Sequence, residues 1–163
     1  MAAKHPSKLD LGDYLPYLVN RVGTIVAEQF GAETLAPHDL SIVMWRVMAV
    51  LATNGDQRQI DLADLTSIDA STLSRIVTRL VRLGFVTRMR SASSNREVVV
   101  ALSAKGSALV ARLIPLARAI ETDASTGLTA EELGVLKRGL RRMYRNMTAR
   151  PTAAGPRPKR LAG

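Results

Sequence analysis

The stretch DASTLSRIVTRLVRLGFVTRMR, residues 69–90, constrains the fold more than any other part of the chain. It carries five arginines and no acid after its first residue, and its apolar residues recur at the spacing of an amphipathic helix. One side of the helix is apolar, and we expect it to be buried: Leu73, Ile76, Val77, Leu80, Leu83 and Gly84. The opposite side carries only hydroxyl and guanidinium groups and suits an anionic partner. Its members are Ser71, Thr72, Ser74, Arg75, Thr78, Arg79 and Arg82.

Both ends of this helix are marked by residues that favour a helix boundary. Asp69 can accept hydrogen bonds from the free backbone N–H groups of the first turn, and Gly84 is the usual residue for a helix stop. Before it, QIDLADLTSID predicts a short helix followed by a turn over residues 67–69. The sequence therefore predicts a helix-turn-helix.

A β-hairpin is predicted directly after the arginine-bearing helix. The segments FVTRMR (85–90) and REVVVAL (96–102) are β-rich, and the small polar residues SASSN (91–95) connect them. This hairpin adds three arginines, Arg88, Arg90 and Arg96. A helix-turn-helix followed by a hairpin is the winged-helix arrangement, in which one helix enters the DNA major groove and the hairpin contacts the backbone or minor groove. The arginines would then bind DNA phosphates and base edges.

The rest of the chain is predicted to be helical. Apolar residues at helical spacing predict helices over about 15–26 and 40–51, and TNGD (53–56) ends the second of these. Ser103 is placed to cap a helix that runs to about residue 125 and is bent or interrupted at Pro115. Thr129 and Glu132 form a capping-box pattern that opens a last helix to about residue 147. The expected fold is mainly α with a small β-hairpin wing.

Composition limits the classes of function. The 163 residues carry a formal net charge of +9, and nine Lys or Arg with no acid lie between residues 137 and 160. This C-terminal basic run is interpreted either as added non-specific DNA affinity or as a solubilising tail. There is no cysteine and only two histidines, so neither a disulfide nor a metal site is expected, and no cofactor. No apolar run is long enough for a membrane span or a signal peptide, which predicts a cytoplasmic protein without a membrane partner.

An enzyme is not expected. Asp61 and Asp64 are spaced as paired carboxylates, but they lie near the start of a short helix, where acids favour the helix dipole. The sequence also lacks a G-x-G-x-x-G motif and a P-loop. A winged helix used only for protein contact, or an architectural DNA binder without an effector, remains an alternative.

Three segments together resemble the MarR family of transcriptional regulators: LSIVMWRVMAVLA (40–52), DLADLTSIDASTLSRIVTRLVRLGFVTR (61–88) and NREVVVALSAKGSALV (95–110). The resemblance implies a homodimer whose N- and C-terminal helices interlock. It also implies that Ser71, Thr72, Ser74, Arg75 and Arg79 face DNA and that Arg96 is the wing-tip arginine. One departure from the family is Ser94, which stands where an Asp usually pairs with that arginine. Without that ion pair the wing would be either looser or held by contacts from Ser93, Ser94 and Asn95.

The apolar stripes outside the winged helix indicate dimerisation without the resemblance. The lobe needs only the apolar faces of residues 40–102, which leaves the stripes at 15–26, 109–120 and 133–147 in excess. A second copy would bury them, giving a two-fold dimer that reads a pseudo-palindromic operator in double-stranded DNA. The expected division is a mobile N-terminus (1–9), one fold (10–147) and a disordered basic tail (148–163). Within the fold, 10–36 and 104–147 would form dimerisation helices and 39–103 the DNA-binding lobe.

A ligand crevice between the dimerisation helices and the lobe is a further implication of the resemblance. Aromatic rings near cations suit an anionic aromatic compound or its acyl thioester, and such a ligand would release a repressor from DNA. The residues that could line the crevice are Tyr14, Tyr17, Arg21, His38, Trp45 and Arg46.

Overall fold

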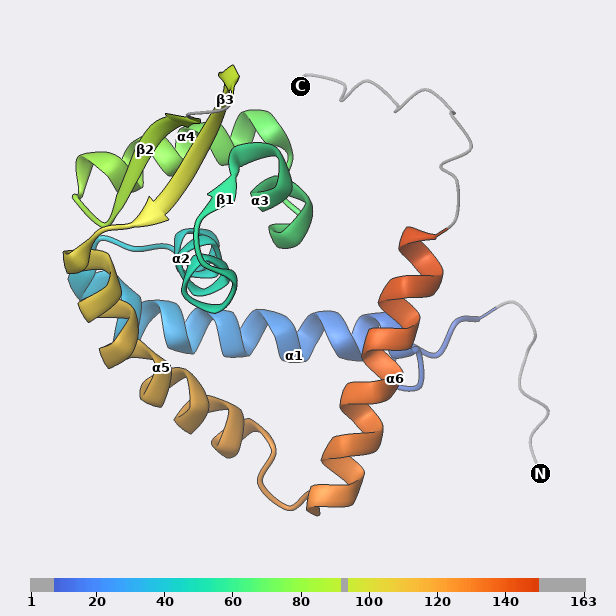
Figure 1. The fold of residues 1–163 in the computed structure, drawn as a ribbon. Helices are drawn as coiled ribbons and strands as arrows, with labels where there is room; N and C mark the ends of the chain where they lie inside the picture. Colours follow the sequence, from blue (N-terminus) through green and yellow to red (C-terminus); the bar gives the residue numbers. More distant parts are fainter. Residues whose placement is uncertain (1–7, 92–93, 150–163) are drawn as a thin grey trace, which may run out of the picture. The chain divides into compact units, whose positions relative to one another are not determined.

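The computed structural model describes residues 8–91 and 94–149, although not the side chains of residues 90, 91 and 94–96. The chain forms two compact units, 1–124 and 125–163, and each is described by itself (Figure 1). The helices and strands of the first unit are α1 (Leu15–Phe30), α2 (Ile42–Asn54), β1 (Gln57–Arg58), α3 (Gln59–Thr66), α4 (Ala70–Arg82), β2 (Val86–Ser91), β3 (Ser94–Leu102) and α5 (Ala104–Ala124). The second unit contains α6 (Ala130–Thr148). The predicted class, mainly α with a small β wing, is confirmed.

The wing is one strand larger than predicted. β2 and β3 form the expected antiparallel hairpin, and β1 pairs with the other side of β3, giving the order β1-β3-β2. β1 is only two residues long, too short to show an alternating pattern in the sequence. The hairpin strands also extend into the predicted loop, since Ser91 pairs with Ser94. Backbone pairing depends on the neighbouring strand and tolerates the small polar residues there.

The core of the first unit lies between α2, α4, α5 and the sheet. Leu73, Val77 and Leu80 of α4 are fully buried, as is Val47 of α2. Within the unit, α4 packs against β2, α2 packs against β3 and α5, and α5 packs against α1 (Figure 1). The apolar side of α4 is therefore fixed inside the lobe, and the opposite side is presented to solvent.

The predicted boundaries of α4 are confirmed. The carboxylate of Asp69 accepts a hydrogen bond from the Ser71 hydroxyl (2.6 Å) and another from the Thr72 backbone N–H (2.9 Å). These bonds stabilise the ionised form, so the pKa of Asp69 lies well below its usual range. Gly84 follows the helix with φ +76°, a left-handed conformation that ends it. Gly84 is exposed, so the prediction that it belongs to the buried stripe is wrong, because the chain has already turned away there.

The apolar stripe of α1 remains exposed within the chain. Val22 and Ile25, two of its members, have 57% and 50% of their surface accessible. After α1 the backbone continues through a π-helical turn (Gly31–Leu35) and a 3₁₀ turn (Ala36–His38), which the sequence did not predict. Leu35 is fully buried in the core and fixes the path of this connection. Although α1 packs against α5, most of its apolar stripe is thus left uncovered inside its own unit.

The helices α5 and α6 begin as predicted. The Ser103 hydroxyl accepts a hydrogen bond from the backbone N–H of Gly106 (2.9 Å). Thr129 and Glu132 form the complete capping box, whose hydrogen bonds lower the pKa of the Glu132 carboxyl. Pro115 was predicted to bend or interrupt this helix, and α5 is not interrupted there, since it runs from residue 104 to 124. A proline removes one helical hydrogen bond, which a long helix can lose without ending.

The predicted tail (148–163) overlaps the last residue of α6 and otherwise lies mostly outside the described residues. α6 includes Thr148, and residues 150–163 are not described. Among the described residues, no single helix is long and apolar enough to cross a membrane. Two consecutive helical segments, Leu15–His38 and Ile42–Asn54, are long and apolar enough only when taken together, and they meet at a bend of 79°.

Candidate nucleic-acid interface

The polar side of α4 forms an open, shallow groove of about 700 Å³. It gathers five of the seven helix residues predicted to face DNA, together with two neighbours. Arg75, Thr78, Arg79 and Arg82 are exposed, and Thr72 and Ser74 are half-buried. The full lining is Asp39, Ser74, Arg75, Thr78, Arg79, Arg82 and Leu83. Guanidinium and hydroxyl groups therefore share one accessible surface.

Local hydrogen bonds orient these side chains without neutralising them. The guanidinium of Arg75 donates to the Thr72 hydroxyl (3.3 Å), and that of Arg79 reaches the Asp39 carbonyl oxygen (3.5 Å). None of the arginines of α4 forms an ion pair with an acid in the described part of the chain. Each guanidinium has five N–H donors, so most of them remain available to an incoming anion. The groove therefore keeps its positive charge.

Arg88 connects the wing to the helix-turn-helix. Its guanidinium donates to the side-chain oxygen of Gln59 (3.0 Å) and reaches the backbone carbonyl of Ser74 in α4 (3.4 Å). The sequence predicted that Arg88 contacts DNA directly. In the structure its side chain also joins the wing to α3 and α4. Since the residue is exposed, its remaining donors face solvent.

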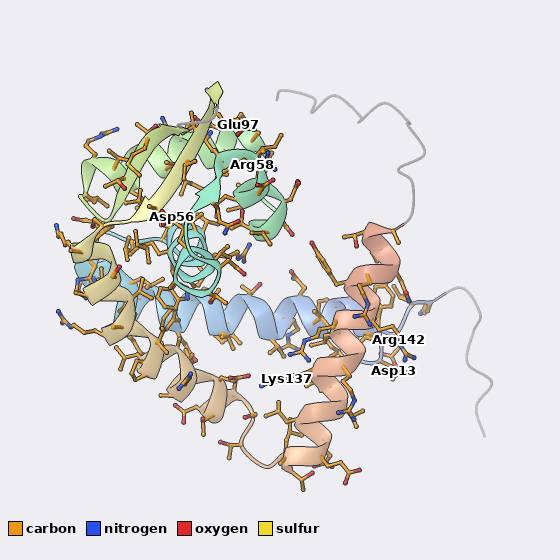
Figure 2. The ribbon with its side chains drawn as sticks, in the orientation of Figure 1. Asp13, Asp56, Arg58, Glu97, Lys137 and Arg142 are labelled. Carbon is orange, nitrogen blue, oxygen red and sulfur yellow. The ribbon has the colours of Figure 1, made fainter. Side chains whose placement is uncertain are left out.

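Arg58 is a supporting residue that the sequence argument missed. Its guanidinium forms a bidentate pair with Asp61 (2.6 and 2.9 Å) and also contacts Glu97 of β3 (3.1 Å). Figure 2 labels Arg58 and Glu97. The hydrogen bond to Asp61, followed by that to Glu97, raises the pKa of Arg58 above its usual value. We call Arg58, Asp61 and Glu97 the Arg58 clamp. Asp61 thus has a specific structural partner in addition to its place in the first turn of α3.

The C-terminal end of α4 is fastened to the start of α5. The Ser103 hydroxyl donates to the carbonyl oxygen of Gly84 (2.6 Å), and the Lys105 ammonium lies 4.7 Å from the centre of the Phe85 ring. Gly106 packs so closely on the backbone of Phe85 that a Cβ atom would collide with it. This contact gives a physical reason for the LSAKG motif, because any larger residue at 106 would separate α5 from the lobe.

The tip of the wing is not part of the described structure. Ser93 lies outside the described residues, and the side chains of Arg90, Ser94, Asn95 and Arg96 are not described. Their DNA contacts stay predictions.

The residues predicted to line a ligand crevice do not gather in one hollow. Trp45 and Arg46 line a hollow of about 410 Å³ on α2, and Arg46 also lines one of about 550 Å³ between α1 and α2. The Trp45 ring meets the Phe30 ring edge-on at 5.6 Å. Arg21 stacks over Tyr17 instead, with its guanidinium carbon 5.7 Å from the ring centre. Tyr14 is exposed and His38 is half-buried.

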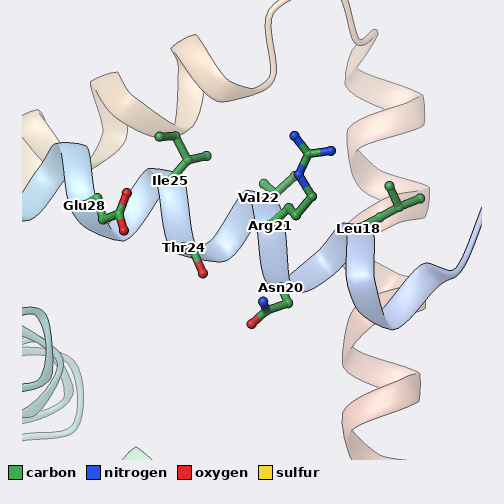
Figure 3. A pocket seen from close by; sticks show the side chains of 7 residues that line it. All are labelled: Leu18, Asn20, Arg21, Val22, Thr24, Ile25 and Glu28. Carbon is green, nitrogen blue, oxygen red and sulfur yellow. The ribbon is translucent and has the colours of Figure 1, made fainter. Parts of the chain in front are cut away.

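A further hollow of about 520 Å³ lies along α1 alone (Figure 3). Its lining comes from a single helix, and Figure 3 shows the labelled side chains pointing to several sides of α1. Because no second element encloses it, this hollow is a poor ligand site and a natural contact face for another helix. Among the described residues, no group of three or more acidic or histidine side chains could hold a metal ion.

A helix-turn-helix of α3 and α4, followed by an antiparallel wing, defines a winged-helix DNA-binding protein. The sequence model of the MarR family matches residues 40–98. An HTH-type transcriptional repressor of Mycobacterium tuberculosis is 28% identical over 129 residues, covering 79% of this chain and 92% of the repressor. A homoprotocatechuate degradative operon repressor of Escherichia coli is 32% identical over 75 residues, 46% of this chain and 51% of that protein.

Solved structures agree. A MarR family transcriptional regulator from Silicibacter pomeroyi is 28% identical, with a TM-score of 0.76 over 88% of this chain and 97% of that one. At 24% identity, Bordetella bronchiseptica BpsR, whose DNA binding is regulated by 6-hydroxynicotinic acid, shares the fold (TM-score 0.73, 80% of this chain and 98% of BpsR). A variant of Escherichia coli MarR complexed with operator DNA does so too (24%, TM-score 0.72, 79% and 92%). The chain thus contains a MarR-family domain over residues 40–98, the domain of a DNA-binding transcriptional regulator.

Proposed function

We propose that this regulator is a homodimeric repressor, acting in the cytoplasm, that inserts α4 into the major groove of a pseudo-palindromic operator. The observation that carries the proposal is the polar side of α4. Its arginines and hydroxyls are exposed and unopposed by acids among the described residues, whereas its apolar side is locked in the core. A helix held in this way can present side chains to base edges at a fixed angle.

The predicted DNA-binding residues are proposed to contact different parts of the DNA, depending on their length and position. Arg75, in the middle of the exposed side, is proposed to contact a base edge, where a bidentate guanidinium contact discriminates guanine. Arg88 and the wing-tip Arg96 are proposed to contact phosphates, which adds affinity without sequence preference. Short hydroxyl side chains such as Ser71 would contact the nearest phosphates at the start of α4.

Dimerisation is supported by apolar side chains that the chain itself does not cover. On α1 the stripe that includes Val22 and Ile25 is exposed, and on α6 no side chain is buried. Contiguous apolar faces of this kind usually mark an interface. We propose that residues 10–36 and 104–147 contribute the interface and that residues 39–103 form the DNA-binding lobe. Half-sites would then lie about 10 bp apart.

The effector is proposed to be a small anionic aromatic compound or its acyl thioester. The hollow between α1 and α2 has a volume typical of small-molecule sites, and the exposed guanidinium of Arg46 supplies a cation at its edge. Trp45 lines the neighbouring hollow. BpsR responds to an aromatic acid, and a second relative is named for the degradation of another, which supports the same chemical class here. Such a ligand must bind the DNA-incompetent form more tightly to release the operator.

The DNA proposal is tested with duplexes that the wild-type protein selects from a randomised library. We expect tight, sequence-selective binding that the double variant Arg75→Ala/Arg79→Ala loses. If that variant binds the selected duplex as well as wild type does, α4 does not read DNA and the winged helix serves another contact.

The effector proposal is tested by titrating aromatic acids and thioesters while Trp45 fluorescence and binding of the selected duplex are recorded together. We expect at least one compound to change both signals, and Arg46→Ala to weaken that response. No response across a broad panel would favour a constitutive regulator, such as an architectural DNA binder.

A further inference from the structure

α6 carries a second row of arginines, separate from α4 in both sequence and compact unit. At about 100° per residue, the five basic side chains of the helix fall on one arc of about 140°. They are Lys137, Arg138, Arg141, Arg142 and Arg145. Six apolar side chains occupy a different arc of about 100°, and Val135 lies outside it: Leu133, Leu136, Leu140, Met143, Tyr144 and Met147. Figure 2 labels Lys137 and Arg142, the residues at the two edges of the basic arc.

Three residues form the centre of this arc: Arg138, Arg141 and Arg145. All three are exposed, and none pairs with a carboxylate in the part of the chain that the structure describes. They extend over roughly 10 Å of helix, since each residue adds about 1.5 Å. Residues 133–163 contain no Asp or Glu, so no acidic side chain in that stretch offsets this charge. We call these three residues the α6 arginine face.

We propose that the α6 arginine face binds the phosphate backbone of double-stranded DNA without sequence preference, at a site separate from α4. Double-stranded DNA carries one negative charge per about 1.7 Å of its axis, so a row of this length faces several phosphates. Arginine pairs well with phosphate because its planar guanidinium can donate two parallel hydrogen bonds. The inference rests on the proposed dimer and on its operator contact through α4, but not on the proposed effector.

DNA is favoured over an anionic membrane by the arrangement of the two arcs. A helix that lies on a membrane inserts its apolar arc between the lipids. In the proposed dimer the apolar arc of α6 is buried in the interface and cannot insert into a membrane. The basic arc stays exposed and can bind a partner through charge alone. A dimer that holds its operator through α4 would thus be able to hold a second DNA segment through α6.

The experiment is a two-duplex capture assay. A selected duplex is fixed on beads and saturated with protein, unbound protein is washed away, and a fluorescent duplex of random sequence is added. We expect the wild-type protein to capture the second duplex. The triple variant Arg138→Gln/Arg141→Gln/Arg145→Gln should capture at least about tenfold less, with binding of the first duplex unchanged and capture less dependent on salt by about 2–3 in the logarithmic slope.

The matched control is Arg112→Gln/Arg118→Gln, which removes two exposed arginines of α5 outside the arc and should capture DNA as wild type does. If the triple variant is misfolded by circular dichroism, the lysine triple variant replaces it and should retain capture, because the charge is kept. Equal capture by wild type and the glutamine variant would overturn the proposal. So would no capture by wild type, or retention of the protein by anionic phosphatidylserine vesicles in place of DNA.

Discussion

α4 and α6 have the same kind of sequence but different surroundings. Both are amphipathic, both carry arginines on one side, and both begin with a side-chain oxygen that caps the first turn. α4 buries Leu73, Val77 and Leu80 completely within its own unit, whereas α6 buries no side chain. Packing inside its own unit therefore fixes the orientation of α4, whereas the apolar side of α6 requires another surface to cover it. Only the first kind can present arginines at a fixed angle for reading a sequence.

The largest expected effect is on folding stability and concerns the buried side of α4. Leu80→Ala in α4 should lower the free energy of unfolding by about 2–5 kcal/mol, because it leaves a cavity in a fully buried position. Leu65→Ala on the exposed side of α3 should change it by less than about 0.5 kcal/mol. Urea denaturation of both variants measures the two values. Similar losses would mean that the lobe is not packed as described.

The second expected difference is in assembly. Leu136→Asp places a charge on the apolar side of α6, where 46% of the leucine is exposed, and should convert the proposed dimer to a folded monomer. Ile60→Asp, at a more exposed position on α3, should leave the mass unchanged. Light scattering after gel filtration measures both masses. A wild-type protein that is already monomeric at micromolar concentration would remove the dimer from this account.

The caps of the two helices should respond to acid with the same sign. The pKa values of Asp69 and Glu132 are both lowered by hydrogen bonds to the ionised carboxylate, so each ionised group stabilises the fold. That contribution is fully present above the unfolded pKa values, about 3.9 for Asp and 4.3 for Glu, and is lost as the pH falls toward the folded values. Denaturation at pH 7 should therefore show Asp69→Asn less stable than wild type. The gap should close as the pH falls below about 4, and a constant gap would contradict the assignment.

The smallest expected effect concerns the Arg58 clamp, which supports the wing beside α4. Its members are about half exposed, with 49% of the Arg58 side chain accessible, and solvent weakens such pairs. Arg58→Gln and Glu97→Gln should each weaken binding of the selected duplex by about two- to fivefold. The double variant should be no worse than the poorer single variant, because both remove the same contact. Fully additive losses would show that the two side chains act independently.

Local chemistry made much of this fold predictable. Asp69, Ser103 and the Thr129–Glu132 pair mark helix starts through bonds that span only three residues, and each prediction is confirmed. The missed features depend on distant partners. Arg58 meets Glu97 across 39 residues of sequence, and β1 exists only because β3 lies beside it. Pro115 was expected to bend or interrupt α5, and the helix is not interrupted there.

Part of the candidate site could likewise be predicted from local sequence, and part of it could not. The exposed face of α4 could be derived from helical periodicity, since its apolar side had to be buried. The six predicted ligand residues could not be placed by periodicity, because they lie on α1, α2 and the turn between them. Arg21 in fact stacks on Tyr17 within α1, whereas Arg46 faces the hollow between α1 and α2.

The central claim is that α4 reads DNA sequence through its exposed arginines. Fluorescence anisotropy with a selected duplex and a scrambled duplex, at one fixed salt concentration, tests it most directly. For Arg75→Ala we predict a loss of about tenfold or more on the selected duplex and little change on the scrambled one, because a base-edge contact is removed. Equal losses on both duplexes would show that Arg75 contacts only phosphates, and no loss on either would contradict the claim that α4 is the reading helix.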